Sequence, residues 1–337
     1  MKPPPKSGPR RSSTKGGIMR RMSHVPRRTG SSMRITSAPK AESHLVAPAP
    51  ASWPVKSQIR TWESAVDVTA AAYTAAGAAS AVESAAFTPE AWMELQGTVA
   101  IVTGAARGIG RATAVALAQA GARGVAIVDL KEPELAETAE LVRGAGAEAL
   151  PLVADVGSLG ALRAMIAEVD ATFGRIDVLH NNAGLGEGPP DWPDIAPERT
   201  AAIVDINLRG VVLGTQLALP VMKRGGGGAI VHTASGAAYT PVPPQAVYAG
   251  TKAGIVQFTK SCIPLHESHG VRVNCVCPGL VETDMVHESG DGDVADWLRP
   301  MYDSVELLRP EDIADAVLAL VRDDTRVGEA LSVDNPG

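Results

Sequence analysis

The sequence predicts an α/β fold: a single doubly wound domain with a mostly parallel sheet of about seven strands and helices on both faces, preceded by a disordered extension. Three observations predict it. From residue 97 onward, short apolar runs rich in Val, Ile and Ala alternate with stretches of helical length. A glycine-rich loop follows the first of these runs, and the composition changes sharply near Met93. Strands that are apolar on both faces and separated by helices are typical of parallel sheets covered on both sides.

The first 92 of the 337 residues differ from the rest of the chain. Residues 1–60 carry 13 Lys and Arg residues and one acid, Glu42, whereas the remaining residues carry 18 bases and 36 acids. Such a polar, basic segment cannot bury enough apolar area to offset its ordering entropy, so we expect residues 1–92 to be disordered, with local helix in the alanine-rich part. Four interpretations stay open: a transit peptide, a basic arm for nucleic acid or anionic lipid, an ordinary tail, or a start codon assigned upstream of a true start at Met93.

Several classes of protein and site are disfavoured. Three cysteines make no disulfide framework, which indicates a reducing compartment and a cytoplasmic protein, or an imported one if the extension is a transit peptide. No run of eighteen apolar residues predicts a membrane span, and the basic arm lacks the aromatics of a single-strand binder, so we expect neither a membrane nor a nucleic acid as partner. His266 and His269 lack the His-Glu-x-x-His spacing, and Cys275 and Cys277 alternate along one strand, so no metal site is predicted.

The elements follow in order along the domain, which we expect to cover residues 93–337. Helices are predicted between the strands, for example over 110–121, 160–174 and 246–262. The order strand, helix, strand, helix, strand at the start is that of a Rossmann-type sheet. The predicted strands are 98–104, 124–130, 148–156, 176–184, 228–235, 271–279 and 329–333.

A dinucleotide site is predicted where the first strand meets the first helix. The loop there reads Thr-Gly-Ala-Ala-Arg-Gly-Ile-Gly, and its members Gly104, Gly108, Ile109 and Gly110 would let the backbone approach a pyrophosphate at the helix N-terminus. Asp129 ends the second strand, where a carboxylate accepts hydrogen bonds from a ribose diol and repels a 2′-phosphate. This favours NAD as cofactor over NADP. Arg107 is the opposing signal, because a guanidinium can pair with a 2′-phosphate.

A catalytic group is predicted on the helix over 246–262. Tyr248 and Lys252 are four residues apart and therefore face one side of the helix, where the cation would lower the pKa of the phenol. The phenol could then exchange a proton with an alcohol or carbonyl oxygen. Ser235 ends a predicted strand at the edge where open α/β sheets bind ligands, and its hydroxyl could hold the substrate oxygen.

With these motifs in this order, residues 95–337 resemble the short-chain dehydrogenase/reductase family in its compact form. The resemblance implies that Asn207 joins Ser235, Tyr248 and Lys252 as a catalytic residue by kinking a helix and holding a water, and that Tyr248 and Lys252 also contact the cofactor, Lys252 through the nicotinamide ribose. It further implies a dimer or tetramer. The additional cofactor-binding positions that it implies are Asp155, Val156, Asn182, Ala183, Gly184, Pro278, Gly279 and Thr283.

The predicted activity is hydride transfer between NAD and a secondary alcohol or ketone. The phrases over 210–222, 246–261 and 270–285 look like those of NAD-dependent secondary alcohol dehydrogenases, hydroxyprostaglandin dehydrogenase among them. Three alternatives stay open: an NADPH-dependent carbonyl or ketoacyl-thioester reductase, a dinucleotide-binding sensor without turnover, and an enzyme tethered by its basic arm.

Overall fold

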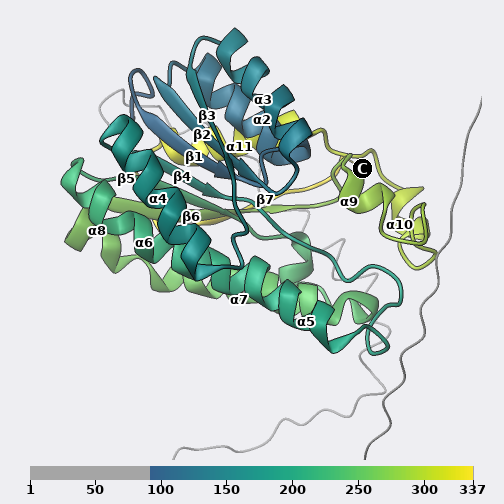
Figure 1. Ribbon diagram of the computed structural model, residues 1–337. Helices are drawn as coiled ribbons and strands as arrows, with labels where there is room; N and C mark the ends of the chain where they lie inside the picture. Colours follow the sequence, from purple (N-terminus) through teal and green to yellow (C-terminus); the bar gives the residue numbers. More distant parts are fainter. Residues whose placement is uncertain (1–91, 337) are drawn as a thin grey trace, which may run out of the picture. The chain divides into compact units, whose positions relative to one another are not determined.

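A seven-stranded parallel sheet forms the centre of the protein in the computed structural model, which describes residues 92–336 (Figure 1). The extension predicted over 1–92 lies, apart from Trp92, outside the described residues. The strand order is β3-β2-β1-β4-β5-β6-β7, and every neighbouring pair is parallel. The strands are β1 (Val99–Thr103), β2 (Gly124–Asp129), β3 (Glu148–Val153), β4 (Val178–Asn181), β5 (Gly228–Thr233), β6 (Val271–Pro278) and β7 (Ala330–Val333).

Helices cover both faces of this sheet (Figure 1). One face packs against α2, α3 and α11 and the other against α4 and α6, in two separate apolar clusters. Two short helices, α9 and α10, lie beyond one end of the sheet. The helices are α2 (Gly108–Gln119), α3 (Glu132–Gly144), α4 (Leu159–Phe173), α5 (Pro197–Val204), α6 (Val211–Arg224), α7 (Ala246–Ser261), α8 (Pro264–His269), α9 (Asp284–His287), α10 (Arg299–Tyr302) and α11 (Pro310–Arg322).

The predicted fold class is confirmed, and the differences concern where the strands end. The start of each predicted strand lies within two residues of the observed start. Several predicted strands end too late, however: 148–156 is observed as Glu148–Val153, and 176–184 as Val178–Asn181. The chain leaves the sheet at these points to form the loops at its carboxyl edge. The first residues of these loops, 154–156 and 182–184, include small and apolar side chains, so composition alone did not separate them from strand.

A continuous helical run joins α5 to α6 through a π-helical turn, Asp205–Gly210. By length and composition alone this run, Pro197–Arg224, is long and apolar enough to cross a membrane. Its apolar character has a different explanation in this fold, because α6 buries Val211, Ala218 and Met222 against the sheet and its neighbours.

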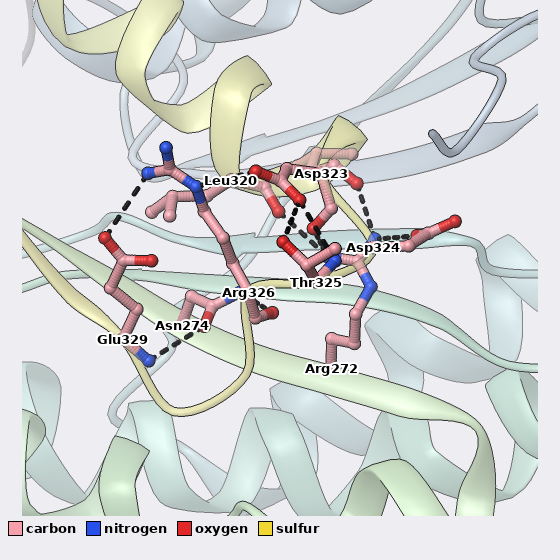
Figure 2. Close-up of polar contacts among 9 residues, drawn as sticks. Arg272, Asn274, Leu320, Asp323, Asp324, Thr325, Arg326 and Glu329 are labelled. Carbon is pink, nitrogen blue, oxygen red and sulfur yellow. Dashed lines mark hydrogen bonds and ion pairs between the residues drawn. The ribbon is translucent and has the colours of Figure 1, made fainter. Parts of the chain in front are cut away.

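The amino edge of the sheet is fastened by Arg272, near the start of β6. Its guanidinium donates to the carbonyl oxygens of Leu320 (2.9 Å), Val321 (2.6 Å) and Asp323 (3.0 Å) at the end of α11 and pairs with Asp324 (Figure 2). A cation at a helix C-terminus satisfies carbonyl groups that have no partner within the helix. The first described residues dock here as well, since the amide of Met93 donates to the carbonyl of Arg322.

Candidate active site

The carboxyl edge of the sheet brings together the residues that the sequence singled out. β1 and β4 lie side by side at the point where the strand order changes direction, with β2 and β3 on one side and β5, β6 and β7 on the other. Open α/β sheets bind their ligands outside the carboxyl ends of the strands at such a point. The loops after β1, β4, β5 and β6 all meet there.

The loop after β1 has room for a backbone but not for side chains. Gly104 has a positive φ of 66°, and a Cβ there would lie 2.8 Å from the Cα of Ala183. A Cβ on Gly110 would collide with the carbonyl oxygen of Gly104. The amino end of α2 is therefore packed tightly against the loop that precedes it, with the first amides of the helix directed at the loop's concave side. This arrangement fits a pyrophosphate, because backbone amides and the helix dipole both favour an anion.

Asn182 holds the glycine loop against β4 and β5. Its amide nitrogen Nδ2 donates to the carbonyl oxygens of Thr103 (3.0 Å) and Gly104 (3.3 Å), and its Oδ1 accepts from the hydroxyl of Thr233 (3.1 Å). The backbone amides of Asn182 and Ala183 donate to Oγ1 of Thr103 at 2.9 and 3.1 Å. The structure thus brings Asn182 and Ala183 to the predicted dinucleotide site, in contact with the loop that they support.

Asp129 lies at the end of β2 with its carboxylate fixed by backbone amides. Oδ2 accepts from Ala106 in the glycine loop (3.0 Å), and Oδ1 accepts from Leu130 (2.7 Å) and Lys131 (3.1 Å). A carboxylate with three such donors holds its negative charge in one place beside the glycine loop.

Arg107, the opposing signal in the sequence, lies in the glycine loop with its side chain 39% exposed. Its guanidinium pairs with Asp284 and, at 3.8 Å, with Glu288, both in the segment around α9. The same segment touches the glycine loop at Gly108, where a Cβ would lie 3.2 Å from Cγ2 of Thr283. The region after β6 is thereby connected to the glycine loop by an ion pair and by packing.

Other predicted cofactor residues lie on the same edge. Asp155 is exposed and accepts from the amide of Gly157 at 2.8 Å, while the carbonyl of Val156 is approached closely by Gly210 of the π-helical turn. Pro278 ends β6, and Gly279 follows it. The next residue, Leu280, makes two hydrogen bonds of 2.7 Å with the side chain of Asn335: its amide donates to Oδ1, and its carbonyl accepts from Nδ2. The last described residues therefore brace the loop that contains Gly279.

Ser235, Tyr248 and Lys252 come together as predicted. Ser235 caps the short 3₁₀ helix Gly236–Ala238, where its hydroxyl accepts from the amide of Ala237 at 3.2 Å, and it lies close enough to Tyr248 to lower the pKa of the phenol. Tyr248 and Lys252 lie on one side of α7, with the Lys252 ammonium 5.4 Å from the centre of the phenol ring. Lys252 is 3% exposed and its Nζ donates to the carbonyl of Thr233 at 2.6 Å.

The electrostatics of this group correct one expectation. The pKa of Tyr248 is raised, not lowered: burial is the largest cause, the hydrogen bond with Ser235 partly opposes it, and the charge of Glu187 adds to it. Burial also lowers the pKa of Lys252 to about 8, which nearby Cys277 and Cys275 oppose. The reasoning from the lysine alone was wrong because it neglected the loss of hydration of the phenolate.

Asn207 lies fully buried in the π-helical turn, so the helix irregularity expected at this position is present. Its side chain makes two hydrogen bonds of 2.8 Å with the backbone of Leu185: Oδ1 accepts from the amide, and Nδ2 donates to the carbonyl. Its Nδ2 also donates to the hydroxyl of Thr251 in α7 at 3.3 Å. Asn207 therefore connects the loop after β4 to the helix that carries Tyr248.

Sequence reasoning missed one residue of this site, Glu187. It is 3% exposed and lies in the loop after β4, where its carboxylate accepts from the backbone amides of Val247 and Tyr248. The contact joins positions about 60 residues apart. No local pattern in the sequence marks Glu187.

Comparisons with known proteins agree with this geometry. A family model described as short chain dehydrogenase matches residues 98–293. The chain is 37% identical over 242 residues to a 2-(R)-hydroxypropyl-CoM dehydrogenase of Xanthobacter autotrophicus, which covers 70% of this chain and 96% of the relative. It is 32% identical over 249 residues to an uncharacterized oxidoreductase of Thermotoga maritima, covering 72% and 98% of the two chains. A crystal structure of 3-ketoacyl-(acyl-carrier-protein) reductase from Brucella melitensis, complexed with NADH, matches with a TM-score of 0.64 at 32% identity and covers 71% of this chain and 98% of that one.

Proposed function

Because the chain belongs to the short-chain dehydrogenase family of NAD(P)-dependent oxidoreductases acting on CH–OH groups, we propose that it transfers a hydride between NAD and a secondary alcohol or its ketone. The observation that carries the proposal is the cluster of Ser235, Tyr248 and Lys252 beside the glycine loop. In this proposal the bound nicotinamide accepts or supplies the hydride. The residues of the chain orient the substrate and move the proton.

Each catalytic side chain has a role that follows from its surroundings. The Ser235 hydroxyl, which acts on the pKa of Tyr248, would hold the substrate oxygen at the phenol. The raised pKa of Tyr248 keeps its proton on the phenol at neutral pH, ready to be donated to a ketone oxygen during reduction. Lys252 lies beneath the ring, so its charge would stabilise the phenolate left after that transfer.

Asp129 and Arg107 support NAD as the preferred cofactor. The carboxylate of Asp129 is held rigidly at the end of β2, where it would bind a ribose diol and repel a 2′-phosphate. Arg107, the group that could have attracted that phosphate, is already paired with Asp284 and Glu288.

Cofactor binding tests this part of the proposal. Titration of the full-length protein with NADH and NADPH, followed by fluorescence, should give at least a tenfold preference for NADH. D129A should reduce that preference, mainly by strengthening NADPH binding, since a like charge has been removed from the position of the 2′-phosphate. A preference for NADPH in the unaltered protein would instead support an NADPH-dependent carbonyl reductase.

Turnover tests the activity itself. The protein should oxidise a probe such as 1-phenylethanol with NAD, and reduce acetophenone with NADH, in an absorbance assay. Y248F should lower kcat for both by more than about a hundredfold while changing the Kd of NADH much less, because the proton-transferring oxygen is lost and most contacts to the cofactor remain. Tight NADH binding with no turnover across a panel of alcohols and ketones would favour the alternative of a dinucleotide-binding sensor.

The name of one relative supports a secondary alcohol as substrate, and the name of another supports a ketone, the substrate of the reverse reaction. A 2-hydroxypropyl group carries a secondary alcohol, and a ketoacyl reductase acts on a ketone. We therefore propose the bond that both share, the CH–OH to C=O interconversion, as the chemistry of this site.

A further inference from the structure

The helix that carries Tyr248 lacks a cap of its own. Gln245 occupies the N-cap position of α7 and makes no side-chain hydrogen bond to the helix. The first amides of a helix have no partner within it, and a side-chain acceptor at the N-cap ordinarily serves the second or third. In α7 these amides belong to Val247 and to Tyr248 itself.

Glu187 supplies the missing acceptor from a distant part of the chain. Its Oε1 accepts from the amide of Val247 at 2.7 Å, and both of its carboxylate oxygens lie 3.3 Å from the amide of Tyr248. An acidic group at a helix N-terminus also interacts favourably with the helix dipole. The backbone of the proton-transferring residue is thus bonded directly to a buried acid.

The loop that carries Glu187 is held in place on its other side. Gln245 accepts from the backbone amide of Glu187 at 3.0 Å, so the two segments are connected in both directions. Arg199 of α5 donates to the carbonyl oxygens of Gly186 (2.7 Å) and Glu187 (3.3 Å). A shift of Glu187 would therefore be transmitted to α7 rather than absorbed by a loose loop.

The charge of Glu187 acts on the phenol as well. Burial raises the pKa of Glu187, the amides of Val247 and Tyr248 partly oppose this, and Asp191 in the same loop adds to it. The charged and titratable groups that face Glu187 are Asp191, Arg199 from α5 and Tyr248 from α7. The Glu187 carboxylate in turn raises the pKa of Tyr248.

We propose that Glu187 is the positioning residue of Tyr248: its carboxylate fixes the first turn of α7 and places a negative charge against the backbone of the proton-transferring residue. This inference rests on the proposed function, in which Tyr248 transfers the proton. It assigns to the loop after β4 a part in the reaction without any contact with the reacting atoms.

The test compares E187Q, E187A and the control E198Q in the full-length protein. E187Q keeps the size and one oxygen acceptor but removes the charge. Glu198 is an exposed acid on α5, so E198Q makes the same change of charge outside the contact. For each variant, kcat for oxidation of 1-phenylethanol by NAD is measured from pH 6 to pH 10, together with the Kd of NADH and the melting temperature.

For E187Q we expect the rising limb of the kcat profile to move to lower pH than in the unaltered protein and in E198Q, because a like charge near the phenol has been removed. E198Q should follow the unaltered protein. E187A should lose about tenfold in kcat with an unchanged Kd for NADH, because the tyrosine is no longer held at its working position.

Two results would overturn the proposal. A pH profile of E187Q that coincides with that of E198Q would show that the charge does not act on Tyr248. A lowered melting temperature with unchanged kcat and profile would show that the cap is merely structural. If E187A fails to fold, the profile of E187Q still decides. Absence of turnover in the unaltered protein, or full activity of Y248F, would instead refute the proposed function on which this inference rests.

Discussion

Acidification from pH 7 to pH 5 should destabilise the folded domain through two histidines, His180 and His232. Both are fully buried at the ends of β4 and β5, and burial lowers the pKa of each from 6.5 to about 3. Their neighbours add to the effect, since His232 acts on His180 and Lys252 acts on His232. Nε2 of His180 bonds to Thr233 and Nδ1 of His232 bonds to Asn181, while the other nitrogen of each ring is buried without a hydrogen-bond partner among the described residues, so a second ring proton would be buried unpaired.

The sign and size of the effect follow from these pKa values. A histidine whose pKa is lower in the folded state contributes stability that is complete above 6.5 and is lost as the pH falls towards 3. At pH 5 the loss is roughly 2 kcal/mol for each ring, from 1.4 kcal/mol per pH unit. The two together amount to about 4 kcal/mol, a large share of the ~5–15 kcal/mol typical of a folded domain. The raised pKa of Glu187 acts in the opposite direction and offsets a small part.

Urea unfolding followed by circular dichroism at pH 7 and pH 5 measures this loss. H180N and H232N should each remove about half of the difference between the two pH values, whatever they do to stability at pH 7. H266N, at an exposed position, is the matched control and should leave the difference unchanged. If both core variants lose as much stability on acidification as the unaltered protein, the assignment to these two rings is refuted.

Three further predictions concern the edge of the site. G110A should destabilise the fold by about 3 kcal/mol in the same unfolding assay, because the added methyl group would collide with the Gly104 carbonyl. The control G144A should be nearly neutral, because a Cβ at Gly144 has nothing within 4 Å. Equal effects of the two variants would contradict the tight packing at Gly110. R107A should change the ratio of the Kd of NADPH to the Kd of NADH by less than about threefold, because the guanidinium is paired with two acids. A tenfold loss of NADPH binding alone would show that Arg107 binds the 2′-phosphate. Since the pKa of Tyr248 is raised, oxidation rates should climb with pH above neutrality, whereas reduction rates should stay nearly constant there because the phenol keeps its proton. A flat oxidation profile in steady-state assays would count against Tyr248 as the proton carrier.

The sheet and the glycine loop could be predicted because their signals are local. An apolar run such as residues 99–103 is buried on both faces, and only a parallel sheet between two helical layers accommodates the five such runs of β1, β2, β4, β5 and β6. Gly104 and Gly110 stand at positions where a side chain would collide with the backbone. Where burial or lack of space restricts a single position, the residue type at that position shows it, and the sequence alone suffices for the prediction.

The remaining features depend on contacts between segments far apart in the chain. Glu187 is one acid among many in the sequence, and its function as a cap arises only when the loop after β4 meets the start of α7. Arg107 carried a clear local signal, yet its partners Asp284 and Glu288 come from a segment that no pattern connects to it. The direction of the Tyr248 pKa likewise depends on burial, which a four-residue spacing does not report.

The contacts of Arg272 with the end of α11 have a practical consequence for handling the enzyme. The described chain enters at Trp92 and Met93, beside the end of α11 and the start of β6, whereas the glycine loop and Tyr248 lie at the carboxyl ends of the strands. A fluorophore or linker attached at this point would therefore lie at the amino edge of the sheet, opposite the edge that carries the glycine loop and Tyr248.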